Sequence, residues 1–302
     1  MSTGPILVAG RSGQLARCLV ESAAQRGTPL VAVGRPELDV EDARSVEHAV
    51  RTVEPSAVVN AAAYTAVDRA ESEPARAFSV NRDGAERLAV EAQRLGVPLI
   101  QISTDYVFDG RKSSPYTEED AALPLGVYGR SKLEGEGAVR NACPAALVLR
   151  TSWIYSPYGH NFVKTMLRLS ETRDHVRVVQ DQWGSPTAAN DLANAILDIL
   201  GQLGRGGFSS RASVYHLVAQ GETTWHGFAS TIFAGWAERG RPVTRLTPIR
   251  SAEYPAAARR PANSRLDCGK IERQFGIRLP PWQRSLDACL DRLLAEPELQ
   301  RC

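Results

Sequence analysis

Residues 5–16 are PILVAGRSGQLA, a short apolar run followed by a turn with two glycines and then the start of a helical pattern. The run is typical of a buried strand, and the helical pattern continues to residue 26. Glycines at such a turn let the backbone approach a diphosphate, and the free N–H groups of the helix N-terminus point at the same anion. We therefore predict a dinucleotide-binding turn. Its predicted contact residues are Gly10, Ser12, Gly13, Gln14 and Leu15.

The spacing of this turn is G-x-x-G-x-x-A, which differs from the G-x-G-x-x-G of many dehydrogenases. Ala16 fills the last small position, where the helix must pack closely on the sheet. A plain tight turn is the alternative interpretation, because a glycine-rich turn alone is weak evidence. The alternating strands and helices around the turn favour a nucleotide site.

The first half of the chain alternates short β-branched runs with longer helical patterns, which is typical of βαβ units and a parallel sheet. We expect an α/β fold, a doubly wound parallel Rossmann-type sheet with a smaller α/β substrate-binding lobe. The expected strands are residues 5–9, 30–33, 57–60, 98–103 and 146–150, and the expected helices are residues 14–26, 42–52, 74–95 and 131–140. The expected dinucleotide-binding domain is residues 1–150, rejoined by about 176–211, and the substrate lobe is mainly residues 151–175 and about 212–302.

The composition excludes several classes of protein. Of the 302 residues, 43% are apolar and 23% are charged, which argues against a disordered or fibrous chain. The formal net charge of +2 is too small to indicate nucleic-acid binding by bulk electrostatics. The sequence has no long apolar window and no signal-peptide pattern, so we expect a soluble, cytoplasmic protein that does not bind membranes.

The cysteines favour reduced thiols over a disulfide framework, because their number is odd and no C-x-x-C pair occurs. No zinc-ligand spacing occurs among them or the five histidines, so we expect no metal site. The five cysteines are Cys18, Cys143, Cys268, Cys289 and Cys302.

The segment after the second expected strand bears on the choice of cofactor. Where an acidic residue would bind a ribose 2′-hydroxyl, Arg35 stands instead, and arginine suits a 2′-phosphate. We therefore expect NADPH as the cofactor, with NADH also accepted. A solvated surface arginine is the alternative. Asp39 and Val40 follow a few residues later, and we expect them to bracket the adenine.

Tyr128 and Lys132 are four residues apart at the start of an expected helix, so both side chains lie on one face within reach of one ligand. An ammonium near a phenol favours the phenolate, so we expect Lys132 to lower the pKa of Tyr128 toward the range useful for acid–base catalysis. A surface Tyr/Lys pair is the alternative, because Y-x-x-x-K is common by chance. Thr104 ends the fourth expected strand, so we expect its hydroxyl to enter the same cleft.

These features together resemble the extended short-chain dehydrogenase/reductase superfamily and, within it, the dTDP-4-dehydrorhamnose reductases. The resemblance covers nearly the whole chain, and its blocks are highly specific together although each alone is not. The blocks are residues 10–15, 59–68, 103–110, 128–132, 150–155, 161–166, 181–187 and 260–267. The resemblance implies reduction of the 4-keto group of dTDP-4-dehydro-L-rhamnose to dTDP-L-rhamnose, with hydride from NADPH or NADH.

The resemblance also implies a role for individual residues. Tyr128 would donate the proton, Lys132 would hold the nicotinamide ribose, and Thr104 would polarise the ketone. The implied cofactor contacts after the third strand are Ala63, Tyr64 and Thr65, and the substrate contacts are Thr104, Asp105, Trp153, Arg260 and Arg265.

Some of these assignments have plain structural alternatives. Arg260 and Arg265 suit a nucleotide diphosphate, because guanidinium binds phosphate oxygens in a fixed fork, but they could equally form a solvated face. Trp153 could be a buried aromatic at the junction of the two lobes.

Two other functions fit the same motifs. A reductase of another dTDP-4-keto-6-deoxyhexose would carry nearly the same residues. The fold also resembles the regulatory subunit of methionine adenosyltransferase, so a catalytically silent dinucleotide-binding protein is a second alternative. The joint presence of Thr104, Tyr128 and Lys132 favours an enzyme.

The expected oligomeric state depends on whether the chain can bind a bridging metal ion. Some relatives form a dimer bridged by Mg²⁺ through glutamates, and the aligned positions in this chain are Cys18 and Asn190. Neither is a good ligand for a hard cation compared with a carboxylate. We therefore expect a monomer or weak homodimer, without a metal-bridged dimer.

Overall fold

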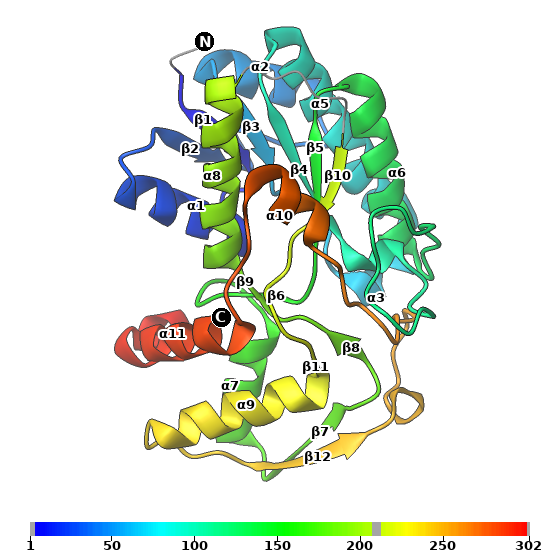
Figure 1. Ribbon diagram of the computed structural model, residues 1–302, viewed down its shortest axis with the longest axis vertical. Coiled ribbons are helices and arrows are strands. Elements are labelled where there is room, and N and C mark those ends of the chain that lie inside the picture. The colour runs from blue at the N-terminus through cyan, green and yellow to red at the C-terminus, as the bar shows by residue number, and fades with distance from the viewer. Residues whose placement is uncertain (1–3, 207–212, 301–302) are drawn as a thin grey trace.

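The computed structural model describes residues 4–206 and 213–300, and a six-stranded parallel sheet lies at its centre. The strands are β1 (Ile6–Ala9), β2 (Leu30–Val33), β3 (Ala57–Asn60), β4 (Leu99–Thr104), β5 (Leu147–Thr151) and β10 (Ser213–His216). Their order across the sheet is β10-β5-β4-β3-β1-β2 (Figure 1). The winding reverses between β1 and β3, where doubly wound folds bind ligands beyond the carboxyl ends of the strands.

β1 is apolar throughout because both of its faces are covered. Ile6 and Val8 pack into one hydrophobic core, while Leu7 and Ala9 pack into a second core on the opposite face. Side chains alternate between faces along a strand, so a strand between two layers of helices has no solvent-facing position. Each buried aliphatic side chain of this kind stabilises the fold by about 1.5–3 kcal/mol.

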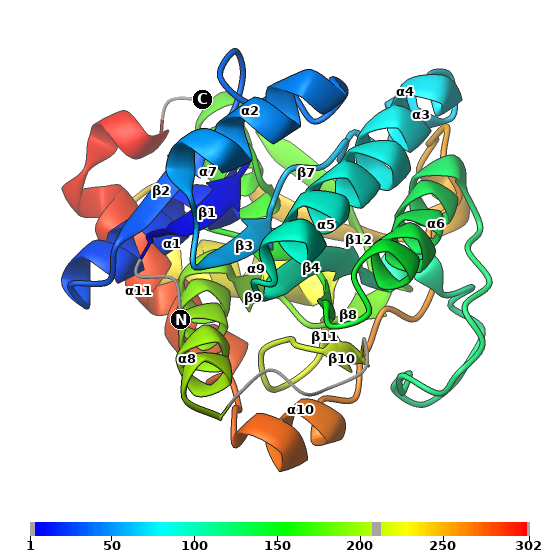
Figure 2. The ribbon, with the colours of Figure 1, turned by 90° about the horizontal axis from the view of Figure 1, so that it is seen from above.

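Helices cover both faces of the sheet (Figure 2). α1 (Gln14–Gln25) packs against α8 (Ala189–Gly206) on one face, and on the other α5 (Gly84–Leu95) packs between α2 (Ala43–Val53) and α6 (Val127–Ala142). The helix expected over residues 74–95 consists of α4 (Pro74–Phe78), a π-helical turn (Ser79–Asp83) and α5.

A smaller lobe lies below the sheet in Figure 1, beyond the carboxyl ends of the strands. Two helices there pack on a parallel strand pair, and a third helix packs on one of them. These elements are α7 (Phe162–Thr172), α9 (Trp225–Glu238), α11 (Trp282–Ala295), β7 (His175–Val179) and β12 (Arg245–Ile249). Short strand pairs join the lobe to the sheet: β6 (Ile154–Tyr155) with β9 (Thr187–Ala188), and β8 (Trp183–Gly184) with β11 (Thr223–Thr224).

The chain passes between sheet and lobe more than once. β7 opens the predicted return segment 176–211 and pairs with β12 in the lobe, whereas α8, later in that segment, packs beside α1 on the sheet. β10 adds the last strand to the sheet, although it lies in the segment 212–302 predicted for the lobe. The predicted change of domain near residues 211–212 lies outside the described residues.

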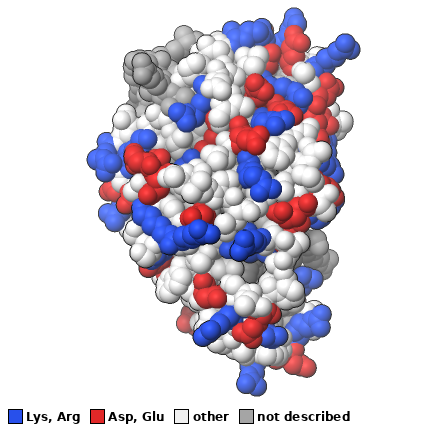
Figure 3. Space-filling model, turned by 90° about the vertical axis from the view of Figure 1, so that its right-hand side faces the viewer, with Lys and Arg blue, Asp and Glu red and all other residues white. Residues whose placement is uncertain are grey.

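The surface carries charges of both signs, and they are interspersed over the face shown in Figure 3. No helix in the described part of the chain is both long and apolar enough to cross a membrane. Cys18, Cys143, Cys268 and Cys289 are free thiols, and Cys302 lies outside the described residues.

Candidate active site

Two joined cavities lie at the carboxyl ends of the central strands. The first, about 420 Å³, runs along the ends of β1 and β2 and is lined by Arg35 and Val40. The second, about 620 Å³, reaches from the α1 N-terminus to the ends of β4 and β5. Ser12 and Gly13 line both. Of the predicted site residues, the structure brings Gly10, Ser12, Gly13, Gln14, Leu15, Arg35, Val40, Ala63, Tyr64, Thr65, Thr104, Asp105, Tyr128, Lys132 and Trp153 to the walls of these two cavities.

The glycine turn is shaped by close backbone contacts. Gly10 has a φ of +110°, and a Cβ there would lie 3.0 Å from the backbone nitrogen of Ala62. The N–H of Gly13 donates to the carbonyl of Gly10 (3.0 Å), and Gly13 then caps α1. Ala16 is fully buried where α1 packs on the sheet. The free N–H groups of α1 therefore face the cavity, ready to bind an anion.

Two arginines lie at the end of the first cavity beside β2. Arg35 pairs with Asp39 (3.1 Å) and Glu41 (2.7 Å). Arg11 pairs with Glu37 (3.1 Å) and donates to the carbonyl of Arg35 (2.9 Å). Sequence reasoning missed Arg11, whose position inside the glycine turn is the signal that could have found it.

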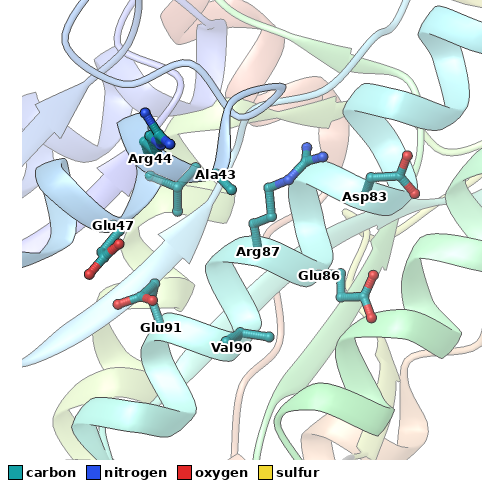
Figure 4. A pocket seen from close by; sticks show the side chains of 9 residues that line it. Ala43, Arg44, Glu47, Asp83, Glu86, Arg87, Val90 and Glu91 are labelled. Atoms are coloured by element: carbon teal, nitrogen blue, oxygen red, sulfur yellow. The ribbon is translucent and has the colours of Figure 1, made fainter.

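Asp39 does not line the cavity but supports the turn that forms its wall. Besides pairing with Arg35, its carboxylate accepts the N–H of Glu41 (3.0 Å), so Asp39 orders the turn that carries Val40. The adjacent hollow between α2 and α5, about 400 Å³, holds Arg87 (Figure 4). Arg87 donates to the carbonyl of Val40 (2.8 Å) and braces the same wall from the other side.

The loop that follows β3 is held by a buried amide. Asn81, on the π-helical turn, accepts the N–H of Tyr64 (2.9 Å) and donates to the carbonyl of Tyr64 (3.1 Å). It also donates to the Ser131 hydroxyl (2.9 Å) on α6. Asn81 therefore fixes the walls at Ala63 and Thr65 relative to the helix that carries Tyr128. Its role could not be foreseen, because these segments are far apart in the sequence.

Tyr128 and Lys132 extend from the first turns of α6 toward the end of β4. Glu71 caps this helix by accepting the N–H of Val127 (2.8 Å). A Cβ at Gly129 would lie 2.1 Å from the carbonyl oxygen of Tyr106, so glycine lets the helix approach the turn after β4. This close approach brings Tyr128 to the cavity that Thr104 also lines.

The hydroxyl of Thr104 lies at the centre of a small network. It donates to a carboxylate oxygen of Asp105 (3.0 Å) and accepts the N–H of Tyr106 (3.2 Å). The other carboxylate oxygen of Asp105 is buried without a hydrogen-bond partner among the described residues. Burial raises the pKa of Asp105 to about 6, against the opposing effect of the hydrogen bond from Thr104.

Burial also governs the two helix residues. It raises the pKa of Tyr128 to about 12, and the charge of Asp105 adds to this effect. The pKa of Tyr128 is therefore raised and not lowered as expected, because loss of hydration outweighs the effect expected of Lys132. The Lys132 ammonium donates to the carbonyl of Ile102 (2.7 Å), and burial lowers its pKa to about 8.

Trp153 stacks on Trp225, with ring centroids 3.6 Å apart and an interplanar angle of 11°. Its backbone is left-handed, with a φ of +48°, which is costly for a bulky residue and persists only where the surroundings enforce it. Trp153 lines the 620 Å³ cavity, and Trp225 lines both that cavity and a third one of about 720 Å³ in the lobe. Sequence reasoning missed Trp225.

The predicted arginines of the late block take different places. Arg260 lines the third cavity and pairs with Asp68 (2.7 Å). Arg265 pairs with Glu222 (3.1 Å) and donates to backbone and side-chain oxygens of neighbouring loops. The structure thus puts Arg260 beside a cavity and uses Arg265 to tie loops together.

Cys18 and Asn190, the positions considered for a bridging metal, line a separate cavity of about 570 Å³. Burial raises the pKa of the Cys18 thiol to about 12, and Asn190 accepts a hydrogen bond from Ser22 (3.2 Å). Nearby, Arg292 pairs with Glu21 (2.7 Å). Within residues 4–206 and 213–300, no cluster of three or more histidine, cysteine or acidic side chains could hold a metal ion.

Known proteins match this chain over nearly its full length. The family model described as "RmlD substrate binding domain" matches residues 4–295. A protein of Sinorhizobium fredii (strain NBRC 101917 / NGR234) named dTDP-4-dehydrorhamnose reductase is 48% identical over 292 residues, 96% of this chain and 98% of the relative. The chain belongs to the dTDP-4-dehydrorhamnose reductase family.

Solved structures of dTDP-4-dehydrorhamnose reductases agree with this assignment. One from Clostridium acetobutylicum ATCC 824 superposes with a TM-score of 0.89 at 34% identity, covering 96% of this chain and 99% of the other. One from Bacillus anthracis str. Ames, in complex with NADP, gives a TM-score of 0.89 at 32% identity, covering 96% and 100%. The resemblance, the Rossmann-type α/β fold and the assignment as an oxidoreductase of the dTDP-4-dehydrorhamnose reductase type are confirmed.

Proposed function

We propose that this chain reduces the 4-keto group of dTDP-4-dehydro-L-rhamnose to give dTDP-L-rhamnose. The observation that carries the proposal is the meeting of Thr104, Tyr128 and Lys132 in one cavity that continues to a glycine turn at a helix N-terminus. A catalytically silent dinucleotide-binding protein has no need of these three side chains together. Reductases of other dTDP-4-keto-6-deoxyhexoses remain the closest alternative in chemistry.

The residues of the two joined cavities fit a nicotinamide dinucleotide. The N–H groups at the start of α1 suit its diphosphate, and Lys132 suits the hydroxyls of a ribose. Ala63, Tyr64 and Thr65 form the wall between the two ends. When bound, the reduced nicotinamide supplies the hydride for the carbonyl carbon of the sugar.

The protein's side chains manage the charge that develops on the carbonyl oxygen. Tyr128 gives its phenolic proton to that oxygen, which prevents an alkoxide from accumulating. Thr104 redirects its hydroxyl hydrogen bond from Asp105 to the same oxygen and so polarises the ketone. The Lys132 ammonium stabilises the tyrosinate that remains after proton transfer.

We propose NADPH as the preferred cofactor, with NADH also used. Arg11 and Arg35 support a 2′-phosphate, because both guanidiniums lie at the ribose end of the first cavity. Both are already paired with carboxylates, so the preference is expected to be modest rather than absolute.

We propose that the sugar contacts Asp105 and Trp153 and that the nucleotide extends toward the third cavity. Asp105 has a buried oxygen free to accept a sugar hydroxyl, and Trp153 offers an aromatic face. Arg260 supports binding of the diphosphate from the wall of the third cavity. Arg265 supports this site indirectly, through the loops that it joins.

We propose further that the enzyme acts in the cytoplasm as a monomer or weak homodimer without a bridging metal. The support is chemical, because a buried thiol at Cys18 and an amide at Asn190 bind hard cations poorly. Mass measurement with and without a chelator tests this proposal, and metal-dependent dimerisation would refute it.

The activity is tested by following oxidation of NADPH and of NADH with enzymatically generated dTDP-4-dehydro-L-rhamnose and identifying the product by chromatography. We expect turnover to dTDP-L-rhamnose, faster at low concentration with NADPH than with NADH. Tight cofactor binding without turnover would favour the silent protein, and turnover of another keto sugar alone would favour the related reductases.

A further inference from the structure

A buried ion pair lies one helical turn below Lys132. Glu136, on α6, accepts two hydrogen bonds from Arg150 of β5, from Nε (2.9 Å) and Nη2 (2.6 Å). It also accepts one from the hydroxyl of Ser103 on β4 (2.5 Å). Glu136 and Arg150 are only 3% and 5% exposed, which excludes a solvated surface pair.

This pair is costly, because both charges have left water, and an apolar pair of similar volume would often be as stable. Stability alone therefore does not explain why this pair is charged. Lys132 and Glu136 are four residues apart on the buried side of α6, where side chains at this spacing are neighbours. Ser103, which binds Glu136, is next in the chain to Ile102, whose carbonyl binds the Lys132 ammonium. Lys132 and Glu136 are therefore anchored to neighbouring residues of β4.

Burial disfavours the charged form of Lys132, and the nearby Glu136 carboxylate favours it. Burial lowers the pKa of Lys132 to about 8, and the charge of Glu136 acts in the opposite direction. A lysine that loses its charge could neither attract ribose oxygens as a cation nor stabilise a tyrosinate. The bidentate hydrogen bond from Arg150 and the hydrogen bond from Ser103 hold the Glu136 carboxylate in one position on this side of α6.

The other charged or titratable groups around Lys132 do not replace Glu136. On its own helix, Tyr128 is neutral below its raised pKa of about 12. From the turn after β4, Asp105 has a raised pKa and is bonded to Thr104. Behind Arg150, His216 has its pKa lowered to about 3 by burial and stays neutral.

On the outer side of α6, Glu134 is exposed and pairs with Arg82 from the π-helical turn (3.1 Å). Solvent screens that pair from the buried ammonium. The carboxylate fixed beneath Lys132 is therefore that of Glu136.

We propose that Glu136 is a positioning residue for the reduction: its carboxylate, fixed by Arg150 and Ser103, keeps the Lys132 ammonium charged and seated against the carbonyl of Ile102. The proposal rests on the function proposed for Lys132. It assigns to Glu136 an effect on Lys132 alone, without contact to sugar or nicotinamide.

The chain has four lysines, so lysine-selective ¹³C NMR can follow the titration of Lys132 without any turnover. A Lys132→Met variant assigns its signal. We expect the wild-type signal to titrate near pH 8 and the Glu136→Gln signal to titrate about 1 pH unit lower or more, because an opposite charge at this range has been removed. Glu134→Gln, on the same helix but exposed, is the matched control and is expected to titrate as the wild type does.

Glu136→Gln leaves Arg150 buried and unpaired, which could prevent folding. The double variant Glu136→Gln/Arg150→Met removes both charges and provides a folded alternative. A downward shift in folded Glu136→Gln supports the proposal, and an unchanged midpoint overturns it. If the single variant does not fold, the same two outcomes in the double variant decide.

Activity provides the second readout. If the sugar is reduced, kcat of Glu136→Gln should fall at a lower pH than kcat of the wild type. A shifted Lys132 titration in a protein without turnover would retain the inference about Glu136 and reject the proposed function. Turnover with an unmoved titration would do the reverse.

Discussion

Gly184→Ala places a methyl group against the indole of Trp153. The ideal Cβ would lie 2.4 Å from Cε2 of Trp153 and 2.7 Å from Cζ2, whereas ordinary contact begins at 3.4 Å. The ring must therefore move by about 1 Å. It cannot move without loss, because it is stacked on Trp225 and its backbone already has a positive φ.

The size of the effect follows from these contacts. Overpacking a filled site costs about 1–3 kcal/mol, and a stacked aromatic pair is worth about 0.5–1.5 kcal/mol beyond its buried area. If a shift of this size is felt by the bound sugar, kcat/KM for the sugar nucleotide falls by about 5- to 150-fold, since 1.4 kcal/mol is tenfold. Binding of NADPH should change little, because the glycine turn and Arg35 are separate from the indole.

The assay measures kcat/KM for the sugar nucleotide together with NADPH affinity by fluorescence titration. Gly137→Ala is the matched control, since Gly137 lies exposed on α6 with no atom within 4 Å of a new Cβ. We expect the control to keep wild-type kinetics and to gain up to about 1 kcal/mol of helix stability. Wild-type kcat/KM in Gly184→Ala would show that the position of Trp153 does not matter to the sugar, and would refute the reasoning.

Three further predictions concern other parts of the molecule. Tyr128→Phe removes the proton donor but keeps the ring, so kcat should fall about 10²-fold or more while NADPH affinity stays within a few-fold of wild type; near-normal turnover would remove Tyr128 from its role. Arg11→Ala/Arg35→Ala should raise the KM for NADPH about tenfold and leave the KM for NADH nearly unchanged; an equal change for both cofactors would contradict a 2′-phosphate site. Burial lowers the pKa of His216 to about 3, so the stability that it contributes is fully present above pH 6.5 and is lost as pH falls toward 3, on the order of 5 kcal/mol. His216→Asn should reduce this acid-side loss in urea unfolding, and an identical pH profile would reject the assignment.

The sheet could be predicted from the sequence because its signals are local. Apolar runs such as residues 6–9 occur at regular intervals between helical patterns, and both cores use the alternation within each run. The start of α6 was harder to predict. The expected helix over residues 131–140 begins earlier, at Val127, because Glu71 caps it from a distant segment.

The residues of the candidate site likewise include some that the sequence predicts and some that it does not. The glycine turn, Thr104 and the Tyr128/Lys132 pair could be found because each is a short pattern at the end of a strand or the start of a helix. Asn81 and Trp225 could not, since their partners are distant in the sequence and their spacing in the chain carries no signal. The pKa of Tyr128 was predicted in the wrong direction because sequence spacing indicates a neighbouring charge but not the depth of burial.

Burial also explains why a buried ion pair affects its neighbours more strongly than an exposed pair does. An exposed pair such as Arg82–Glu134 contributes about 0–1 kcal/mol and is screened by salt. The same chemistry at Glu136–Arg150 acts through a medium of lower effective dielectric, where a fixed carboxylate can keep a neighbouring ammonium charged. A reductase that depends on a buried lysine must meet this requirement near the lysine itself. In this chain the requirement is met from the next turn of the same helix, so the position of Lys132 and its charge are both set by the packing of α6 against β4 and β5.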